Sequence, residues 1–578
     1  MRRGHNRPYA ILEPFGGWPI PPGDFLEAEL SEEVCLSCAE WLREFRDMTG
    51  STFDLVSVDF WQDPTADLVR FNNRFPVGFA RAKAALTESG TRHGLWVDSS
   101  MFPDWQIGLN PLVKNCRTGN PSYAPTPPPT AGGVNPICRA AEPIRSIFSS
   151  AFLHHLREEG ARLLKFDNLV STCHNMSHGH WPGVYSTEAI YNSVIDFFAT
   201  LDDACPEVII MLYWGYRSPW WLLHGDTEFE CGLLIEAASP SPTPSLYARD
   251  GVALTLDQGT AFAADIPHLG KDSLGVWLSR WPWNSSIGTE RWREGIIMDL
   301  CRGSLLFQPW LGEDRLSEAD LRDMGAFLHL LRNHSDCFAK SRLILGDPWR
   351  NEPYAYACAD GRRAFVAVNN FGWRDHAMSF DTPETFGLAA ATAFRVYRHY
   401  PEPARLSGAD GGAPTDCLRP FAVALYEVVV DGETPAVGSD WPEACSRLRF
   451  AEPSSTVSLT VSEGEGTDQT CEFEVSGLAP ASQGAGTLVV AACVTRGGRA
   501  VPERNMGSQL KAAFILNGAS ASATPVLGNF TYHATWQAWR AAIPAGDALE
   551  FTVAVSSQLA KDKDVTFQAW FIPQTEGL

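Results

Sequence analysis

A lysine and an aspartate placed two residues apart are the residues whose types and spacing most directly suggest chemistry. Lys165 and Asp167 end the stretch Leu163-Leu-Lys-Phe-Asp167. Side chains two apart on a strand point to the same face, so this ammonium and carboxylate would project together. Two interpretations are open. The pair is an ion pair that only stabilises a strand end, or Asp167 is a nucleophile whose pKa Lys165 keeps low.

Further carboxylates and tryptophans follow apolar runs in the same part of the chain. Glycoside hydrolysis requires one carboxylate at the anomeric carbon and a proton donor at the leaving oxygen, and indole rings supply apolar faces for sugars. A cluster of these side chains would therefore suit a glycosidase, although some could equally cap helices or pair with arginine. The residues in question are Asp59, Trp61, Trp96, Asp98, Trp220, Trp221, Asp226, Glu230, Glu236 and His268.

The elements that would position these residues alternate between strand and helix from about residue 50 to 340. Apolar runs predict strands at 52–59, 93–98, 163–167, 207–213, 228–236 and 303–308, and amphipathic stretches predict helices at 79–87, 142–159, 186–203, 245–258 and from 317. Such alternation is typical of a parallel sheet, and about eight units over this length fit a (β/α)8 TIM barrel. Catalytic groups of that fold lie at the C-terminal ends of the strands.

The pattern changes after the last helix, where short β runs are separated by Gly, Asp and Pro. We therefore predict three domains: a catalytic barrel at 1–340, an antiparallel β-domain packed on it at 341–434, and a C-terminal β-sandwich at 435–578.

Composition narrows the partners. The formal net charge of −22 disfavours nucleic acid and anionic membranes as partners. The 20 tryptophans suit an oligosaccharide or glycoside substrate. The basic start, residues 1–9, is followed by no long apolar run and so does not resemble a signal peptide, and no run of 18 apolar residues predicts a membrane span. We expect a cytoplasmic protein. The sequence does not indicate its oligomeric state.

Several of these segments resemble glycoside hydrolase family 36, the α-galactosidases and raffinose synthases of clan D. Leu164-Lys-Phe-Asp167 is similar to the Lys-Trp-Asp strand end that carries the family's nucleophile, with Phe166 in place of Trp. Val56-Ser-Val-Asp-Phe-Trp61 and His93-Gly-Leu-Trp-Val-Asp-Ser-Ser-Met101 resemble its first two barrel strands. Segments 218–226, 345–348 and 352–356 resemble its α-galactosidase-like branch. The resemblance spans about residues 50 to 430.

The resemblance implies a retaining α-glycosidase that acts without a cofactor or a metal. It implies that Asp167 attacks the anomeric carbon, while Asp226 or Glu230 serves as acid/base; Glu236 also remains open, because the sixth strand offers more than one carboxylate. Substrate contacts would come from Asp59, Trp61, Trp96, Lys165 and Trp221.

Three alternatives remain at this stage. The protein could be an α-galactosyl or α-N-acetylgalactosaminyl transglycosidase, which differs in its acceptor, or a carbohydrate-binding barrel without catalysis. The closely spaced His174, His178 and His180 raise a metal-dependent hydrolase as a third alternative. We interpret these histidines as loop residues, since divalent sites usually draw their ligands from separate strands.

Overall fold

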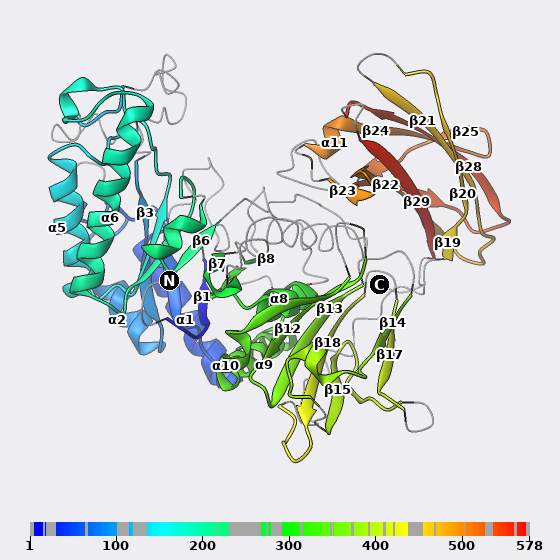
Figure 1. Cartoon of the computed structure of the whole chain (residues 1–578), viewed down its shortest axis with the longest axis horizontal. Coiled ribbons are helices and arrows are strands. Elements are labelled where there is room, and N and C mark those ends of the chain that lie inside the picture. Colours follow the sequence, from blue (N-terminus) through cyan, green and yellow to red (C-terminus); the bar gives the residue numbers. More distant parts are fainter. Residues whose placement is uncertain are drawn as a thin grey trace. The chain divides into compact units, whose positions relative to one another are not determined.

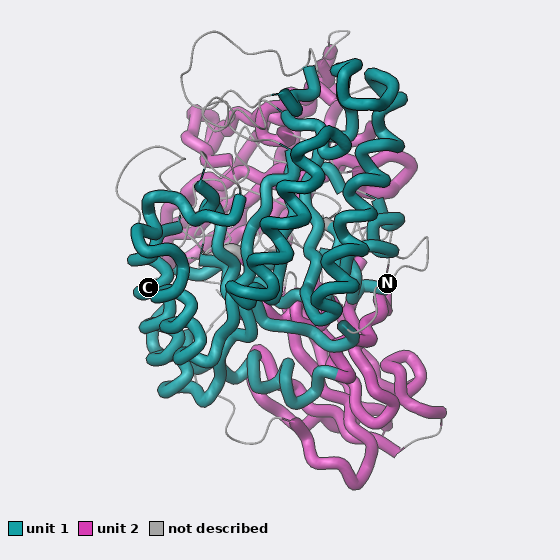
Figure 2. Tube along the Cα trace, turned by 90° about the vertical axis from the view of Figure 1, so that its left-hand side faces the viewer, with its two compact units in different colours: residues 1–231, 264–275, 304–335 teal, residues 232–263, 276–303, 336–578 magenta. Residues whose placement is uncertain are grey.

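The structure is a computed structural model, and its two compact units are coloured separately in Figure 2. The first unit comprises residues 1–231, 264–275 and 304–335, and the second comprises 232–263, 276–303 and 336–578. The structure describes residues 5–14, 18, 30–63, 68–100, 115–119, 136–216, 218–229, 267–272, 275–278, 292–312, 316–346, 350, 352–370, 375–390, 393–408, 412–419, 422–436, 455–466, 470–501, 503, 505–525, 536–559 and 563–573.

The first unit is built on an eight-stranded parallel sheet, which confirms the predicted (β/α)8 barrel (Figure 1). The two outermost strands are joined by a hydrogen bond of 2.9 Å from Leu305 N to Leu269 O, which brings the sheet round toward closure. Around the sheet, the strands are β9 (Leu306–Phe307), β1 (Tyr9–Leu12), β2 (Leu55–Val58), β3 (Arg92–Asp98), β4 (Leu163–Asp167), β5 (Ile209–Leu212), β6 (Thr227–Phe229) and β7 (Lys271–Asp272).

The pairing register places side chains from neighbouring strands at the same height. Gly94 pairs with Leu163, Trp96 with Lys165, and Asp98 with Asp167. A side chain at Gly94 would meet Leu163 at 2.6 Å, so the glycine gives this strand room to lie against its neighbour. Lys165 and Asp167 therefore occupy successive levels on one face at the C-terminal end of β4.

Four helices of the first unit lie close to the predicted positions, and α1 (Glu32–Thr49) was not predicted. The helix predicted from Ser317 is capped as its sequence indicates, since the Ser317 hydroxyl and the Asp320 carboxylate form a capping box. The four helices at predicted positions are α2 (Ala80–Glu88), α5 (Ile144–Arg157), α6 (Thr187–Ala204) and α9 (Glu318–Asn333). The helix predicted at 245–258 lies outside the described residues.

The second unit contains antiparallel sheets, as the sequence predicts beyond the barrel. One of its two six-stranded sheets contributes to a core that includes Val366, Phe380 and Tyr426. The elements of this part are α8 (Trp292–Arg302), β11 (Ser341–Leu345), β12 (Tyr354–Ala359), β13 (Arg363–Asn369), β14 (His376–Ser379), β15 (Phe394–Tyr400), β16 (Ala404–Arg405), β17 (Thr415–Leu418) and β18 (Val423–Val430). The sheet runs in the order β11-β12-β13-β18-β15-β16.

The C-terminal residues form two further antiparallel sheets, and rings of Phe473 and Phe567, one from each sheet, lie 5.3 Å apart. Strands of the first sheet are β19 (Ser455–Val457), β22 (Gly486–Arg496), β23 (Arg499–Ala500), β26 (Thr524–Pro525), β27 (Trp536–Ile543) and β29 (Asp564–Pro573). Those of the second are β20 (Leu459–Glu463), β21 (Cys471–Ala479), β24 (Leu510–Leu516), β25 (Ala519–Ala521) and β28 (Leu549–Ser557).

The main difference from the sequence-based fold lies at the beginning of the chain. The sequence predicts the first barrel strand in the run 52–59, but the first strand is Tyr9–Leu12, which pairs in parallel with both β2 and β9. Four residues are too few to show a period, so the run is recognisable only by its apolar character. Among the described residues, no helix is long and apolar enough to cross a membrane.

Candidate active site

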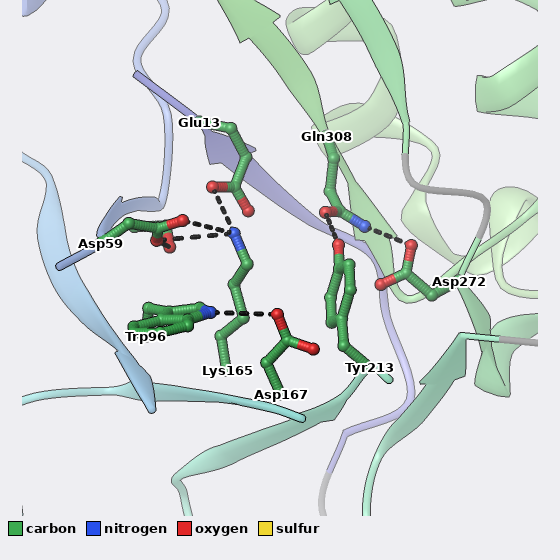
Figure 3. Close-up of polar contacts among 9 residues, drawn as sticks. Glu13, Asp59, Trp96, Lys165, Asp167, Tyr213, Asp272 and Gln308 are labelled. Carbon is green, nitrogen blue, oxygen red and sulfur yellow. Dashed lines mark hydrogen bonds and ion pairs between the residues drawn. The ribbon is translucent and has the colours of Figure 1, made fainter. Parts of the chain in front are cut away.

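Asp167 lies at the C-terminal end of β4, and hydrogen-bond donors reach both of its carboxylate oxygens; Figure 3 shows the one from Trp96. Oδ1 accepts the backbone N–H groups of Asn168 at 2.8 Å and Trp214 at 3.2 Å, and Oδ2 accepts the indole N–H of Trp96 at 3.3 Å. Burial nevertheless outweighs these donors and the charge of Lys165, and it raises the pKa of Asp167 to about 6. Lys165 thus lowers the pKa of Asp167, as expected from the sequence, but burial decides the net direction of the shift.

The loop after β5 supplies one of these donors because it packs tightly against the loop after β4. Leu169 N donates to Trp214 O at 3.0 Å, and Asn168 adopts a left-handed backbone with φ of 58°. Gly215, at φ of 94°, is required here, since a Cβ would lie 2.2 Å from Leu169 O. The carboxylate of Asp167 is thus oriented by two loops of the barrel.

Lys165 does not pair directly with Asp167 but binds two other carboxylates. Its Nζ lies 3.1 Å from Glu13 Oε2 and 3.2 Å from Asp59 Oδ2, and Ser57 donates to Asp59 Oδ1 at 3.0 Å. Burial alone would lower the pKa of Lys165, but Asp59 and Glu13 outweigh it and raise this pKa above its usual value. Burial is also the largest effect on Glu13, raising its pKa to about 7 against the opposing charge of Lys165.

A second polar group lies beyond Asp167 as seen from Lys165 (Figure 3). The Tyr213 hydroxyl donates to Gln308 Oε1 at 3.3 Å, and Gln308 Nε2 donates to Asp272 Oδ1 at 2.8 Å. Burial raises the pKa of Tyr213 well above its usual value, and the nearby carboxylates, Asp272 first among them, act in the same direction. Tyr213 is therefore a neutral hydroxyl at ordinary pH.

Of the predicted aromatic contacts, Trp96 is beside the nucleophile candidate and Trp61 is not. Trp61 is completely buried, donates from Nε1 to Trp96 O at 2.8 Å, and packs its ring against Phe71 and His155. The ring that contacts Trp96 is that of Phe60, with centroids 4.6 Å apart. Phe60 has a φ of 52°, so the chain turns directly after β2. Trp61 therefore supports the position of Trp96 from the core.

Trp221 also lies in a packed aromatic cluster. It belongs to the short helix η5 (Pro219–Leu223), is 1% exposed, and packs edge-on against Tyr191, Phe198 and Tyr216. Because Tyr191 and Phe198 belong to α6, this indole fills the interface between helix and barrel. The structure does not bring it together with Asp167.

Of the three acid/base candidates, only Asp226 lies within the described residues. Asp226 precedes β6, and its Oδ2 accepts the N–H of Ile210, near the beginning of β5, at 2.7 Å. In the register of the sheet, Asp226 is three residues, or about 10 Å, from the level of Asp167. Asp226 therefore lies toward the N-terminal ends of the strands. Glu230 and Glu236 lie outside the described residues.

Four residues of the candidate site were not identified from the sequence: Glu13, Tyr213, Asp272 and Gln308. Glu13 and Tyr213 directly follow apolar strands, which is the signal that identified Asp59. The same signal would have found both if the run 9–12 had been recognised as a strand and the polar end of the run 207–213 considered. Asp272 is the last residue of the two-residue strand β7, which is too short to give any pattern. Gln308 directly follows β9 and ends the predicted run 303–308, so the same signal would have found it.

The barrel mouth thus combines an oriented carboxylate, a buried ammonium held by two carboxylates, and a neutral tyrosine hydroxyl. A carboxylate whose two oxygens are held in place can attack carbon without reorganising. Ammonium, carboxylate and amide groups in a ring are suited to binding several hydroxyl groups at once. The described residues around Asp167 therefore match the needs of chemistry on a polyhydroxylated substrate.

Comparisons with known proteins are informative at the level of structure. No family model and no curated protein matches the sequence. Among solved structures, the chain is similar to the GH36 α-galactosidase AgaA from Geobacillus stearothermophilus in complex with raffinose, with a TM-score of 0.52 and 12% identity over 73% of this chain and 56% of that chain. The α-galactosidase from Lactobacillus brevis gives a TM-score of 0.51 and 12% identity over 75% and 56%.

The galactosidase domain of the α-galactosidase–sucrose kinase AgaSK gives a TM-score of 0.51 and 12% identity, and covers 74% of this chain and 55% of that chain. The present chain thus spans about half the length of these structures. Similarity at this identity shows a shared fold: a parallel barrel accompanied by antiparallel β-sheets.

Proposed function

We propose that this chain is a retaining α-glycosidase that hydrolyses terminal α-galactosides through a covalent glycosyl-enzyme. The observation that carries the proposal is the environment of Asp167, a carboxylate at the C-terminal end of a barrel strand with donors on both oxygens. The choice of α-galactosides is supported by the fold shared with α-galactosidases and by the resemblance of the segments around Asp59 and Asp167 to that family.

In the proposed first step, a carboxylate oxygen of Asp167 attacks the anomeric carbon while the bond to the leaving oxygen breaks and that oxygen receives a proton. In the second step a water molecule attacks the same carbon, loses a proton, and releases Asp167 as a carboxylate. Two inversions give net retention. Only the ionised form of Asp167 can attack, so a pKa of about 6 implies activity that falls below about pH 6.

Glu230 is the acid/base candidate that this proposal favours over Asp226. The carboxylate of Asp226 is committed to the N–H of Ile210, near the beginning of β5. Glu230 directly follows β6, and residues at the C-terminal ends of barrel strands are the ones that reach the active site.

Binding of the sugar is assigned to Lys165, Asp59 and Trp96. Lys165 and Asp59 offer a charged donor and a charged acceptor to adjacent hydroxyl groups, and the Trp96 indole lies beside the nucleophile. Neutral Tyr213 adds a hydroxyl on the other side of Asp167.

Covalent labelling tests the proposal directly. A mechanism-based fluorinated α-galactosyl inhibitor should inactivate the enzyme, and peptide mass spectrometry should find the sugar on the peptide that contains Asp167. Replacing Asp167 by Gly and adding azide should instead produce a β-galactosyl azide. Labelling of a different carboxylate would refute the role of Asp167, and a first hydrolysis product of inverted configuration by proton NMR would refute the retaining mechanism.

A further inference from the structure

Two cysteines and two histidines converge in the loops that follow β3 and β4. The side-chain ligand atoms of Cys138, Cys173, His178 and His180 all lie within 4.8 Å of one another. Cys138 precedes α5, whereas the other three belong to the segment between β4 and α6. His174, which the sequence grouped with the other two histidines, does not belong to this cluster.

Each imidazole of the cluster presents one nitrogen to a sulfur and the other to a backbone carbonyl. His178 Nδ1 lies 3.3 Å from Cys173 Sγ, and its Nε2 lies 2.8 Å from Asn115 O. His180 Nε2 lies 3.2 Å from Cys138 Sγ, and its Nδ1 lies 3.0 Å from Trp181 O. A carbonyl oxygen can only accept, so the nitrogen facing it carries the proton, and the lone pair of each ring points toward the sulfurs.

Backbone contacts order each of the two segments independently of these side chains. Cys138 N donates to Cys116 O at 2.7 Å, and Gly183 N donates to Cys173 O at 2.8 Å. The Ser186 hydroxyl accepts the N–H of Cys173 at 2.7 Å. Both cysteines are fully buried, and the histidines are only partly exposed. The four side chains are therefore preorganised by the fold.

We propose that Cys138, Cys173, His178 and His180 bind a structural zinc ion. Two sulfurs and two nitrogens form the Cys2His2 ligand set of structural zinc sites. With Zn–S bonds of about 2.3 Å and Zn–N bonds of about 2.0–2.1 Å, tetrahedral angles separate sulfur from nitrogen by about 3.6 Å. The S···N separations of 3.3 Å and 3.2 Å are close to this value.

Four protein ligands complete the tetrahedral shell of zinc, and catalytic zinc sites instead keep a position for water or substrate. The ion would link the segment before α5 to the segment after β4, which begins directly after Asp167. Its role is therefore to fix the loop that follows the nucleophile candidate. The site does not depend on the proposed glycosidase function, and it departs from the expectation from sequence that these histidines are only loop residues.

Metal content of matched variants tests the site. The full chain, produced with zinc in the medium and dialysed against metal-free buffer, should retain about one zinc ion per chain by mass spectrometry. His174→Gln should retain the same amount, because His174 lies in the same loop outside the cluster. Cys138→Ser combined with Cys173→Ser should lose it. Zinc retained by the double variant, or lost equally in His174→Gln, would overturn the proposal.

A measurement on the unmodified protein covers the case in which the double variant fails to fold. Exchange of the bound ion for Co²⁺ should produce visible absorption and a sulfur-to-metal band characteristic of tetrahedral coordination by two thiolates and two imidazoles. Unmodified protein that binds neither metal, or in which Cys138 and Cys173 are recovered as a disulfide after purification under reducing conditions, would contradict the site.

Discussion

The two ends of the barrel use carboxylates in different ways. At the N-terminal ends of the strands, Asp54 accepts the N–H of Ala10 at 2.8 Å and Asp226 accepts that of Ile210 at 2.7 Å. Each aspartate immediately precedes a strand, and in each case its own N–H donates at 2.8 Å to the carbonyl of the same partner residue. The device is therefore repeated at two places in the sheet, where it ties the start of one strand to its neighbour.

At the C-terminal ends, carboxylates contact other polar side chains of the candidate site. Glu13 and Asp59 meet at Lys165, and Asp167 receives the indole N–H of Trp96 as well as backbone donors. Burial raises the pKa values of Glu13 and Asp167, so the fold destabilises the charged form of both. Asp54 and Asp226 at one end thus stabilise the barrel, and the charged forms of Glu13 and Asp167 at the other end are held at an energetic cost, which is typical of groups positioned for function.

Replacing Asp167 by Asn should produce the largest contrast between the two ends. Loss of the attacking oxygen removes the covalent path, so kcat/KM should fall by about three orders of magnitude or more. The decrease is measured with an aryl α-galactoside, with Asp226→Asn as the matched change at the other end. Near wild-type turnover by Asp167→Asn would show that Asp167 is not catalytic, and the proposed functional difference between the two ends of the barrel would be wrong.

The same variant should show the cost of the charge. The pKa of Asp167 rises from 3.8 to about 6 on folding, so its favourable contribution is complete below about pH 3.8 and is lost as the pH rises through about 6. The asparagine of Asp167→Asn does not ionise, so this variant does not lose stability in that way as the pH rises. Its melting temperature relative to wild type should therefore increase between about pH 4 and pH 7, and a pH-independent difference would contradict the raised pKa.

Removing the central ammonium should affect both stability and activity. Lys165→Met leaves Glu13 and Asp59 buried without their cation, which should destabilise the fold by about 3–5 kcal/mol at neutral pH. Because Lys165 lowers the pKa of Asp167, the acidic limb of kcat/KM should also move to higher pH. The variant has no charged donor for the substrate hydroxyls at this position, so kcat/KM should decrease about 100-fold.

Lys271→Met is the control for this change. Lys271 forms a buried ion pair with Glu228 at 2.7 Å, so its loss should destabilise the barrel comparably without moving the acidic limb. Equal shifts of the limb in the two variants would mean that Lys165 acts only through stability.

A smaller effect is expected from Trp96→Phe, which keeps the ring and removes one hydrogen bond to Asp167. That bond lowers the pKa of Asp167, so the acidic limb should move above about pH 6, and kcat/KM should decrease about tenfold at the optimum. Trp61→Phe removes an indole N–H that reaches only the Trp96 carbonyl. It should leave the limb in place, and a shift of the same size would assign the effect to packing.

The smallest effect on catalysis is expected at the other end of the barrel. Asp226→Ala and Asp54→Ala should each destabilise the protein by about 1–3 kcal/mol in urea unfolding, because a backbone N–H loses its acceptor. The folded fraction of both should keep kcat/KM within about threefold. If kcat/KM fell by orders of magnitude in Asp226→Ala and not in Asp54→Ala, Asp226 would be the acid/base, and the two aspartates would not share the same structural role.

The sequence predicted the barrel and the place of Asp167 because both depend on local patterns that survive in the fold. The order of apolar runs and amphipathic helices defines the barrel, and a carboxylate after an apolar run marks a strand end. Asp226 was misplaced because β6 has only three residues. A carboxylate near such a short strand can lie before it or after it, and these positions are at opposite ends of a barrel.

The aromatic residues were uncertain for another physical reason. Indoles suit both sugar binding and core packing, and the direction of the chain decides between the two roles. The left-handed turn at Phe60 puts Trp61 into the core, and no signal in the residue types predicts that turn. The cysteine–histidine cluster was invisible from spacing, because Cys138 is distant in sequence from the other three ligands.

The junction between β7 and β9 has a consequence for local opening. Within the described residues these strands form no ladder, and the bonds that join them include Leu305 N to Leu269 O, Ser304 Oγ to Lys271 O, and at the mouth Gln308 Nε2 to Asp272 Oδ1. Two strands without a backbone ladder between them open at lower free energy than a paired strand in the middle of the sheet, so the amide hydrogen of Leu305 should exchange with solvent faster than those of β4. A sugar bound against Asp272 and Gln308 would bridge this seam at the C-terminal ends of the strands. Binding of the sugar should therefore slow the exchange of the Leu305 amide hydrogen, which lies at the opposite end of the strands.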